Sequence, residues 1–317
     1  MNRRRAISSL GALGALGCTS VGASHAQATR TKVTLGYTSV ADYATCFVAQ
    51  EEGYFDRHGL DMSFLLIPLN PSIPPALQSG SIQLGGPTPS VFLQAVDAGL
   101  DQVVLAGAAT TSRKYTGVGL VARAGSGIKS ARDCEGRKIG VPGLGAYLHV
   151  SFRAWLKAEG VDHRKVTFIE TAFPQHGDLL RGGSIDAVVT GDPIMSRIVS
   201  SGVGYVVSYY PTFLPEGLPT IIYAAQREWA SQHPEAARGF HQSIVEAAAF
   251  VAKPQNDARL RQHISKYVKL PPDVLATVQI SPPGPEVTPK GLAWWVDMMK
   301  DQDMLKGQVD VNKLVWA

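Results

Sequence analysis

The chain has 317 residues, of which 45% are hydrophobic and 18% are charged, and its mean hydropathy is +0.02. This composition is typical of a globular protein of about two domains, and it excludes a collagen-like, coiled-coil or largely disordered chain. The formal charge of +4 includes three arginines at positions 3–5. The chain after residue 28 is therefore nearly neutral and offers no basic stripe for a nucleic acid. Three cysteines are too few for a disulfide scaffold.

Residues 1–28 have the pattern of an export signal. The arginines at 3–5 are followed by an uncharged, small-residue stretch over 6–23, and Ala-Gln-Ala at 26–28 fits a cleavage site. This stretch is too short and too rich in glycine to span a bilayer, and its glycines also disfavour the alternative of a buried helix. We expect an exported, periplasmic protein. The twin-arginine route and lipidation at Cys18 stay open as alternatives.

The first part of the mature chain alternates short strands with helices. The expected strands are 32–37, 60–67, 81–85, 103–109 and 117–122, and the expected helices are 43–57, 74–79 and 89–98. Strands separated by helices are typical of βαβ units and predict a mostly parallel sheet. The C-terminal third differs, because it predicts three helices joined by proline-rich segments, at 227–252, 257–268 and 289–302.

The sequence contains an internal duplication. Leu-Gln-Ser-Gly-Ser-Ile-Gln at 77–83 recurs as Leu-Arg-Gly-Gly-Ser-Ile-Asp at 180–186. The same elements surround each copy in the same order: strand, glycine-rich turn, helix, strand, helix, strand, turn and helix. We interpret the repeat as two similar α/β lobes. Chance similarity between two βαβ segments is the simpler alternative.

The order of elements predicts how the chain divides. We expect lobe I to comprise residues 29–115 and 219–317, and lobe II to comprise residues 116–218, because the chain returns to the first sheet near residue 221. Each lobe would be a mostly parallel sheet flanked by helices, and the two crossings would form a hinge. Ligands of open α/β sheets bind beyond the carboxyl ends of the strands, so the cleft between the lobes is the expected site.

Four turns follow strands and are expected to face this cleft. They contain, in chain order, Ser39 with Tyr43, Thr88 before Pro89, Gly145 with Ala146 and Tyr147, and Asp192 before Pro193. The third turn starts a helix, whose free N–H groups and partial positive charge attract anions. Every turn also has a purely structural interpretation, because these residue types are ordinary helix starts and tight turns.

Signals of catalysis are weak. The seven histidines after residue 28 form no HxxxH or HExxH pair, Cys46 and Cys134 have no CxxC partner, and no G-x-S-x-G elbow occurs. The glycine turn also lacks the Gly-Lys-Ser/Thr of a nucleotide-binding loop. The sequence therefore predicts a binding protein rather than an enzyme, with no metal and no cofactor.

Two segments resemble signatures of the periplasmic binding proteins of the sulfonate, taurine, nitrate and thiamine-precursor type. They are AQEEGYFDRHGL at 49–60 and SARDCEGRKIGV at 130–141. The Asp-Ala-Val at 186–188 and Pro193 are similar to that family's second-lobe strand and helix start. The resemblance covers roughly residues 32–300. It implies a two-lobed type II fold that hands a small solute to the membrane permease of an ATP-driven (ABC) importer. We expect a monomer.

The resemblance also implies ligand contacts, carried over residue by residue. They map onto Ser39, Tyr43, Thr88, Gly145, Ala146 and Asp192. As a separate hypothesis, we expect Tyr43 or Tyr147 to pack the apolar part of the ligand. Arg113, near the first crossing, is a candidate counter-ion, and a solvated cation at a hinge is an equal alternative. Asp42 and Asp192 would disfavour an anion if both faced the cleft.

We predict a receptor for a small organic anion, either a sulfonate or an aromatic or aliphatic carboxylate, whose oxyanion lies on the helix start at 145–147. One alternative is a receptor for a pyrimidine or an amine, with Asp42 or Asp192 as the counter-charge. The other is an enzyme on the same scaffold. The sequence leaves open the ligand's identity and charge, and whether Cys46 and Cys134 form a disulfide.

Overall fold

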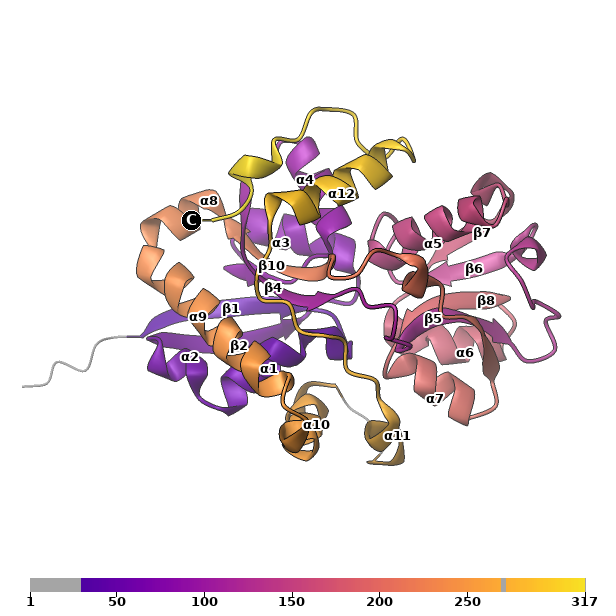
Figure 1. Cartoon of the computed structure of the whole chain (residues 1–317), viewed down its shortest axis with the longest axis horizontal. Helices are drawn as coiled ribbons and strands as arrows, with labels where there is room; N and C mark the ends of the chain where they lie inside the picture. Colours follow the sequence, from indigo (N-terminus) through magenta and orange to yellow (C-terminus); the bar gives the residue numbers. More distant parts are fainter. Residues whose placement is uncertain (1–29, 269–271, 317) are drawn as a thin grey trace, which may run out of the picture.

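The computed structural model describes residues 30–268 and 272–316. The predicted export signal at 1–28 and the lipidation alternative at Cys18 therefore lie outside the described residues. The described chain forms two five-stranded sheets that lie side by side (Figure 1). No helix of this part of the chain is long and apolar enough to cross a membrane.

The first sheet has the strand order β2-β1-β3-β10-β4. Its strands are β1 (Thr31–Tyr37), β2 (Leu60–Leu66), β3 (Leu84–Gly85), β4 (Gln102–Thr110) and β10 (Pro219–Gln226). The central strand β1 runs parallel to β2 and β3. By contrast, β10 runs antiparallel to both β3 and β4.

The second sheet repeats this pairing pattern in the order β7-β6-β8-β5-β9. Its strands are β5 (Val118–Arg123), β6 (Lys138–Val141), β7 (Thr167–Glu170), β8 (Ala187–Gly191) and β9 (Gly204–Ser208). Here β6 is parallel to β7 and β8, and β5 is antiparallel to β8 and β9. Strands β3 and β8 follow the two copies of the repeated heptapeptide and occupy the same place in their sheets, which confirms the internal duplication.

Both sheets are mixed, but four of the five strands in each run in the same direction, and only β10 in the first sheet and β5 in the second are reversed. Each sheet has two parallel and two antiparallel pairings. The antiparallel partners β5 and β10 are the strands that follow a crossing from one sheet to the other. A run of apolar residues shows that a strand is buried but not in which direction it runs. The sequence pattern therefore did not predict that β5 and β10 are antiparallel to their neighbours.

Two connections cross between the sheets, residues 111–117 from β4 to β5 and residues 209–218 from β9 to β10. They lie against each other. The N–H of Thr111 donates to the carbonyl of Leu218 at 2.8 Å, and the N–H of Gly217 donates to the carbonyl of Thr111 at 3.0 Å. Two hydrogen-bonded crossings at one place have the geometry of a hinge.

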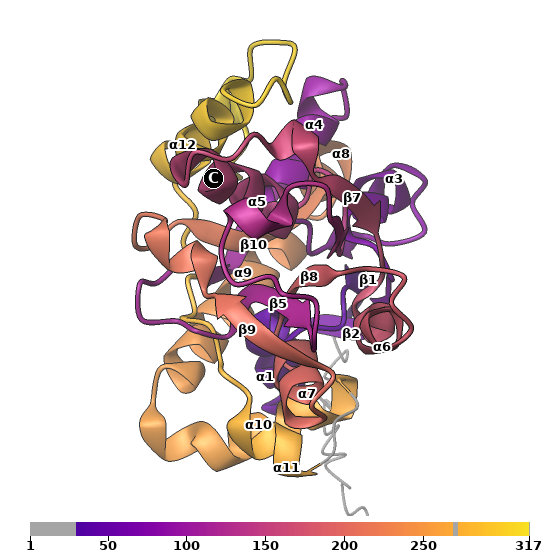
Figure 2. The same ribbon diagram turned by 90° about the vertical axis from the view of Figure 1, so that its right-hand side faces the viewer.

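Helices cover both faces of each sheet. On the first sheet, α1 (Ala44–Glu51) packs against α9 (Pro234–Val251), while α3 (Ile73–Gln78), α4 (Pro89–Asp97) and α12 (Pro289–Lys300) form a second group. On the second sheet, α5 (Tyr147–Ala158) lies on one side, and α6 (His176–Arg181) and α7 (Ile194–Ser200) pack together on the other (Figure 2). The 3-10 turns are η1 (Ala41–Tyr43), η2 (Asn70–Ser72), η3 (Arg132–Cys134), η4 (His163–Lys165), η5 (Phe173–Gln175), η6 (Tyr210–Phe213), η7 (Pro254–Asn256) and η8 (Val311–Lys313).

Two expected helices are each broken into two. The helix expected over 43–57 is α1 followed by α2 (Tyr54–Arg57), because Gly53 between them has a left-handed φ of +69°. The helix expected over 227–252 is α8 (Arg227–Gln232) followed by α9. It breaks before Pro234, which has no N–H to continue the helical ladder. The remaining helices are α10 (Asp257–Tyr267) and α11 (Pro272–Thr277).

The C-terminal segment protects the outer edge of β4. The N–H of Gly107 donates to the carbonyl of Pro285 at 2.7 Å, and the N–H of Val104 donates to that of Leu314 at the same distance. An uncovered edge strand is a template for aggregation. The C-terminal segment therefore packs on the edge of the first sheet, and its helices need no third sheet to pack against.

Cys46 and Cys134 do not form a disulfide with each other. Cys46 lies in α1 beside the first sheet and Cys134 lies in η3 beside the second. Both are buried and free.

Candidate ligand-binding site between the two sheets

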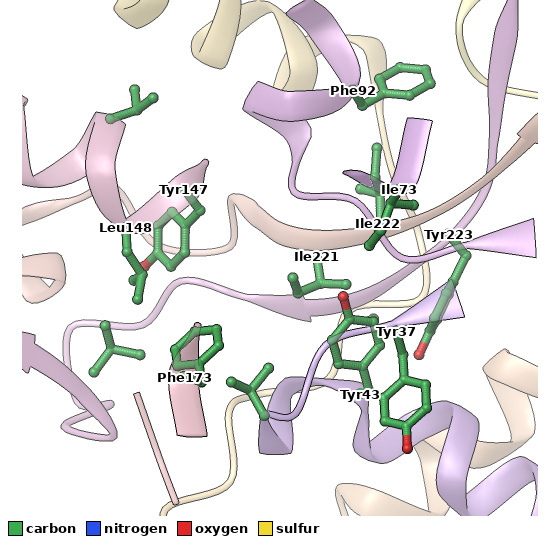
Figure 3. Close-up of a cluster of buried hydrophobic side chains, with 14 of the residues drawn as sticks. Tyr37, Tyr43, Ile73, Phe92, Tyr147, Leu148, Phe173, Ile221, Ile222 and Tyr223 are labelled. Atoms are coloured by element: carbon green, nitrogen blue, oxygen red, sulfur yellow. The ribbon is translucent and has the colours of Figure 1, made fainter. Parts of the chain in front are cut away.

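The walls of a small cavity come from both sheets, at the place where the strand-end turns meet. The cavity has a volume of about 30 Å³. The first sheet and its connections contribute Thr38, Val40, Asp42, Asn70, Thr88 and Ile221, and the second side contributes Val118, Pro142, Ala146, Tyr147, Leu148, Phe173 and Gly191. Figure 3 shows Tyr147, Leu148 and Phe173 on one side, facing Ile221 and Tyr43 on the other.

A second, smaller cavity of about 10 Å³ lies beside the first. The two share Asp42, Val118 and Tyr147 as walls. The smaller cavity reaches the first crossing at Thr111 and Tyr115. The site is thus a pair of adjoining spaces next to the hinge.

The turn after β1 is built around Tyr43, which is fully buried. Its hydroxyl donates to the carbonyl of Gly86. A side chain at Gly86 has no room, since a Cβ there would lie 2.1 Å from the Tyr43 ring. Burial raises the pKa of Tyr43. Tyr43 therefore supports the wall from behind, and neither Tyr43 nor Ser39 is among the lining residues of the cavity.

Thr88 joins the two sides of the site. It is the N-cap of α4, where its hydroxyl oxygen accepts from the N–H of Val91 at 3.4 Å. The same oxygen accepts from the N–H of Tyr147, the first residue of α5, at 3.3 Å. Asn70 holds the turn, because its side-chain oxygen accepts from the N–H of Thr88 at 2.9 Å. The sequence prediction included Thr88 but missed Asn70, whose only signal is an Asn-Pro pair at the start of η2.

The glycine turn brings the N-terminus of α5 to the cavity. Gly145 has a left-handed φ of +80°, and its N–H donates to Nδ1 of His149 at 2.9 Å. Ala146 and Tyr147 line the cavity, as does Leu148. No described residue accepts from the N–H groups of Leu148 and His149. A helix start with free donors carries a partial positive charge and favours an anion.

Asp42 contributes a carboxylate to both cavities. The hydroxyl of Ser281 donates to its Oδ1. Burial raises the pKa of Asp42 to about 6, the Ser281 hydrogen bond opposes this rise, and the nearby charge of Asp192 adds to it. The carboxyl group is therefore still largely ionised at neutral pH.

Asp192 is buried but faces away from the cavity, whose wall here is Gly191. One carboxylate oxygen accepts from the N–H of Ser196 at 3.0 Å and from its hydroxyl at 2.7 Å. The other oxygen accepts from the N–H of Gln279 at 2.7 Å. Burial raises the pKa of Asp192, and these hydrogen bonds oppose the rise. The Asp192 carboxylate thus binds the first turn of α7 at Ser196 and also holds the segment around residue 279.

Arg113 does not line either cavity. Its side chain is exposed, and its backbone N–H donates to Glu216 at 2.9 Å. Within residues 30–268 and 272–316, no lysine, arginine or histidine lies on the wall of either cavity. No cluster of metal-ligating side chains occurs in the same part of the chain.

Residues of α12 and directly after it hold the two sides together. Asp301 pairs with Lys157 at 2.7 Å, and the side-chain amide of Gln302 donates to the carbonyl of Val150 at 3.0 Å. Trp295 packs edge-to-face on Tyr147, with 5.7 Å between ring centroids. The structure therefore shows the two sides in contact around the cavity.

Two mixed sheets joined by paired crossings, with a cavity between them, define the fold of the two-lobed periplasmic binding proteins. Residues 26–265 match the NMT1-like family, and the chain belongs to this family.

Solved structures share the fold. The alkanesulfonate-binding protein SsuA from Xanthomonas axonopodis pv. citri, bound to MOPS, superposes with a TM-score of 0.76 and 18% identity, covering 90% of this chain and 98% of that one. The periplasmic nitrate-binding protein NrtA from Synechocystis gives a TM-score of 0.74 and 16% identity, covering 89% and 84% of the two chains.

The relatives found by sequence are longer than this chain. The nitrate/nitrite binding protein NrtA of Nostoc is 24% identical over 243 residues, which are 71% of this chain and 55% of the relative. The bicarbonate-binding protein CmpA of Synechococcus is 24% identical over 272 residues, which are 78% and 60% of the two chains. The nitrate import ATP-binding protein NrtC of Synechocystis is 24% identical over 271 residues, covering 79% and 39%. This chain spans less than two thirds of the length of each of these three relatives.

Proposed function

We propose that this protein is the periplasmic solute-binding receptor of an ATP-driven (ABC) importer. The observation that carries the proposal is the enclosed cavity between the two sheets, with walls from both. The fold and the family support it, and the relatives named above are binding or import proteins. A receptor binds its solute and passes it to a membrane permease and its ATPase without a reaction, so we assign no catalytic residue.

In this proposal the two lobes close on the ligand. Lobe I comprises residues 29–115 and 219–317, lobe II comprises residues 116–218, and the chain acts as a monomer after removal of residues 1–28. The crossings at 111–117 and 209–218 serve as the hinge, since they are hydrogen-bonded to each other. The ligand shifts an equilibrium between open and closed forms because it touches both walls only in the closed form.

The proposed ligand is a small organic anion, and its negative group lies at the N-terminus of α5. The free N–H groups of Leu148 and His149 favour such a group. The proposed contacts are Thr88, Ala146 and Tyr147, which line the cavity, while Ser39, Tyr43, Gly145 and Asp192 support its walls. A water molecule needs at least about 10–15 Å³. A cavity of about 30 Å³ therefore admits only a very small solute unless the lobes stand further apart.

A receptor for an amine or a pyrimidine is the second candidate. Asp42, on the wall of both cavities, is the observation that favours it. A cation or an N–H group can bind this carboxylate. The N-terminus of α5 disfavours a cation, because it carries a partial positive charge.

Calorimetric titration of the mature protein with sulfonates, nitrate, bicarbonate, aromatic acids and pyrimidines tests the function. We expect saturable binding of at least one small anion, and a stabilisation of about 2.7 kcal/mol at a ligand concentration of 100 Kd. Ala146→Leu adds three carbon atoms to the cavity wall. Overpacking of about 1–3 kcal/mol should weaken binding roughly 5- to 150-fold.

The matched control is Ala158→Leu, at the exposed C-terminal end of α5. It should bind like the wild type. Equal affinity of the wild type and Ala146→Leu for the same anion would place the ligand elsewhere, and binding of none of the anions would reject the proposed ligand class.

A further inference from the structure

Asp42 is the one charged side chain on the cavity walls among the described residues. It is only partly buried although it lies between the sheets, and it lines both cavities. Ser281 donates to Oδ1, and no described residue donates to Oδ2. The carboxylate therefore has a free acceptor atom at the site.

Among the described residues, the polar and charged groups near Asp42 provide no positive charge. They are Asp192, Ser281, Tyr115 and Tyr147, which come from lobe II, from the segment after α11 and from the first crossing. Arg261 lies near Asp192, but it donates to the carbonyls of Leu275 and Val278 and pairs with Asp257. An anion that enters the cavity therefore meets an ionised carboxylate that no cation compensates.

The wall formed by the start of α5 has the opposite polarity and favours a hydrogen-bond acceptor or a negative group. Ala146, Tyr147 and Leu148 bring the donor end of α5 to the same small cavity. One wall therefore offers donors and the other offers an acceptor. Because both walls line the same cavity, a solute bound between them contacts both.

We propose that Asp42 selects the ligand, which is a small anion that also carries a hydrogen-bond donor, a hydroxyl or a protonated amine, directed at Asp42. This inference rests on the proposed function and narrows its ligand class. An anion without a donor leaves the Asp42 carboxylate without a hydrogen-bond partner in a closed site. The negative charges of the anion and the carboxylate also repel each other. Sites that are built to hydrogen-bond a ligand hydroxyl or amine reject the analogue without it strongly, because the protein group is then left without a partner.

The experiment compares ligands that differ only in the donor. The mature protein is titrated at pH 7.5 with ethanesulfonate, 2-hydroxyethanesulfonate and 2-aminoethanesulfonate, and then with acetate and glycolate. Ethylammonium supplies the cation without the anion. We expect the donor-bearing member of each series to bind at least 30-fold more tightly than its plain partner, and ethylammonium to bind more weakly than 2-aminoethanesulfonate.

The variant Asp42→Asn keeps the shape of the side chain and removes its charge. It should lose most of the preference, so that ethanesulfonate binds at least as well as 2-aminoethanesulfonate. Asp61→Asn, at an exposed position on β2, is the matched control and should keep the wild-type preference. The wild-type ligand series remains a valid test even if Asp42→Asn does not fold.

The outcomes separate the inference from the proposed function. Equal affinities within each series would overturn the role of Asp42 and leave an anion receptor. Ethylammonium binding as tightly as 2-aminoethanesulfonate would overturn the anionic half, and with it the proposed ligand class, in favour of the amine receptor. A preference that persists in Asp42→Asn would assign the selection to another residue.

Discussion

Thr88 allows a direct test of whether the contact between the sheets contributes to ligand binding. Its hydroxyl oxygen accepts from two N–H groups, that of Val91 in its own helix and that of Tyr147 across the cavity. Thr88→Val keeps the shape of the side chain and removes this acceptor. The residue is buried, so in the closed form water has little access to replace the lost oxygen.

The variant also removes the 3.2 Å contact between the hydroxyls of Thr88 and Ser90. The losses at Val91 and Tyr147 have different consequences. Loss of an N-cap acceptor costs about 1 kcal/mol of folding stability. An unpaired buried N–H costs about 1–3 kcal/mol, and for Tyr147 this cost arises only when the lobes are closed, because an open cleft lets water bind the group. Ligand affinity should therefore fall roughly 5- to 150-fold, the larger effect being expected if the ligand-free protein is mostly open.

The chain contains a matched control at the start of α12. Thr288 also precedes a proline and caps its helix, accepting from the N–H of Gly291 at 3.1 Å, and it makes no contact across the cavity. We expect Thr88→Val and Thr288→Val to lower the free energy of unfolding in urea by similar amounts. Only Thr88→Val should weaken ligand binding in calorimetry. Equal losses of affinity in both variants, or none in either, would refute the reasoning.

Two further predictions test the glycine turn and a buried histidine. Gly145→Ala should cost about 1–2 kcal/mol for a left-handed φ of +80° and should also weaken ligand binding, because its Cβ would lie 2.6 Å from the amide nitrogen of Gln94. Gly160→Ala has φ +74° and open space, so it should lose stability without losing affinity. Burial lowers the pKa of His176 to about 4, below its unfolded value of about 6.5. The unfolded chain thus takes up the proton first, and stability falls as the pH drops from about 6.5 to 4. We expect the free energy of unfolding in urea of His176→Gln, relative to that of the wild type, to be about 2–3 kcal/mol higher at pH 4.5 than at pH 7.5. The control His233→Gln, at an exposed position, should show no such change. The same pH dependence of unfolding free energy in His176→Gln and the wild type would contradict this prediction.

The strands and their repeat could be predicted because local patterns determine them. Strand periodicity marks a buried strand, and the repeated Gly-Ser-Ile lies just before β3 and β8 in both sheets. The direction of β5 and β10 could not be predicted, since it depends on where the crossings place the chain. The sequence therefore predicted two similar lobes but not the reversed direction of one strand in each.

The candidate site was predicted at the level of turns and less well at the level of side chains. The four turns do surround the cavity, because strand ends of parallel units meet at one edge. Within them, local hydrogen bonds decide which way a side chain points. Tyr43 turns to Gly86, and Asp192 turns to Ser196 and Gln279, so neither lines the cavity. Ile221 lies within β10 and carries no turn signal, and the only signal at Asn70 is its Asn-Pro pair.

The cavity has one donor wall and one acceptor wall because the two copies of the duplicated unit carry different groups at equivalent turns. Strands β1 and β6 hold equivalent places in their sheets. The turn after β1 delivers the carboxylate of Asp42, while the turn after β6 delivers the free N–H groups of α5.

The turns after β3 and β8 differ in a similar way. Thr88 accepts from Tyr147 of lobe II, and Asp192 accepts from Gln279 on the lobe I side. Each of these helix starts therefore also holds the opposite lobe. Two copies of one unit, facing each other, need only different residues at equivalent turns to clamp together around a solute with both a negative group and a donor.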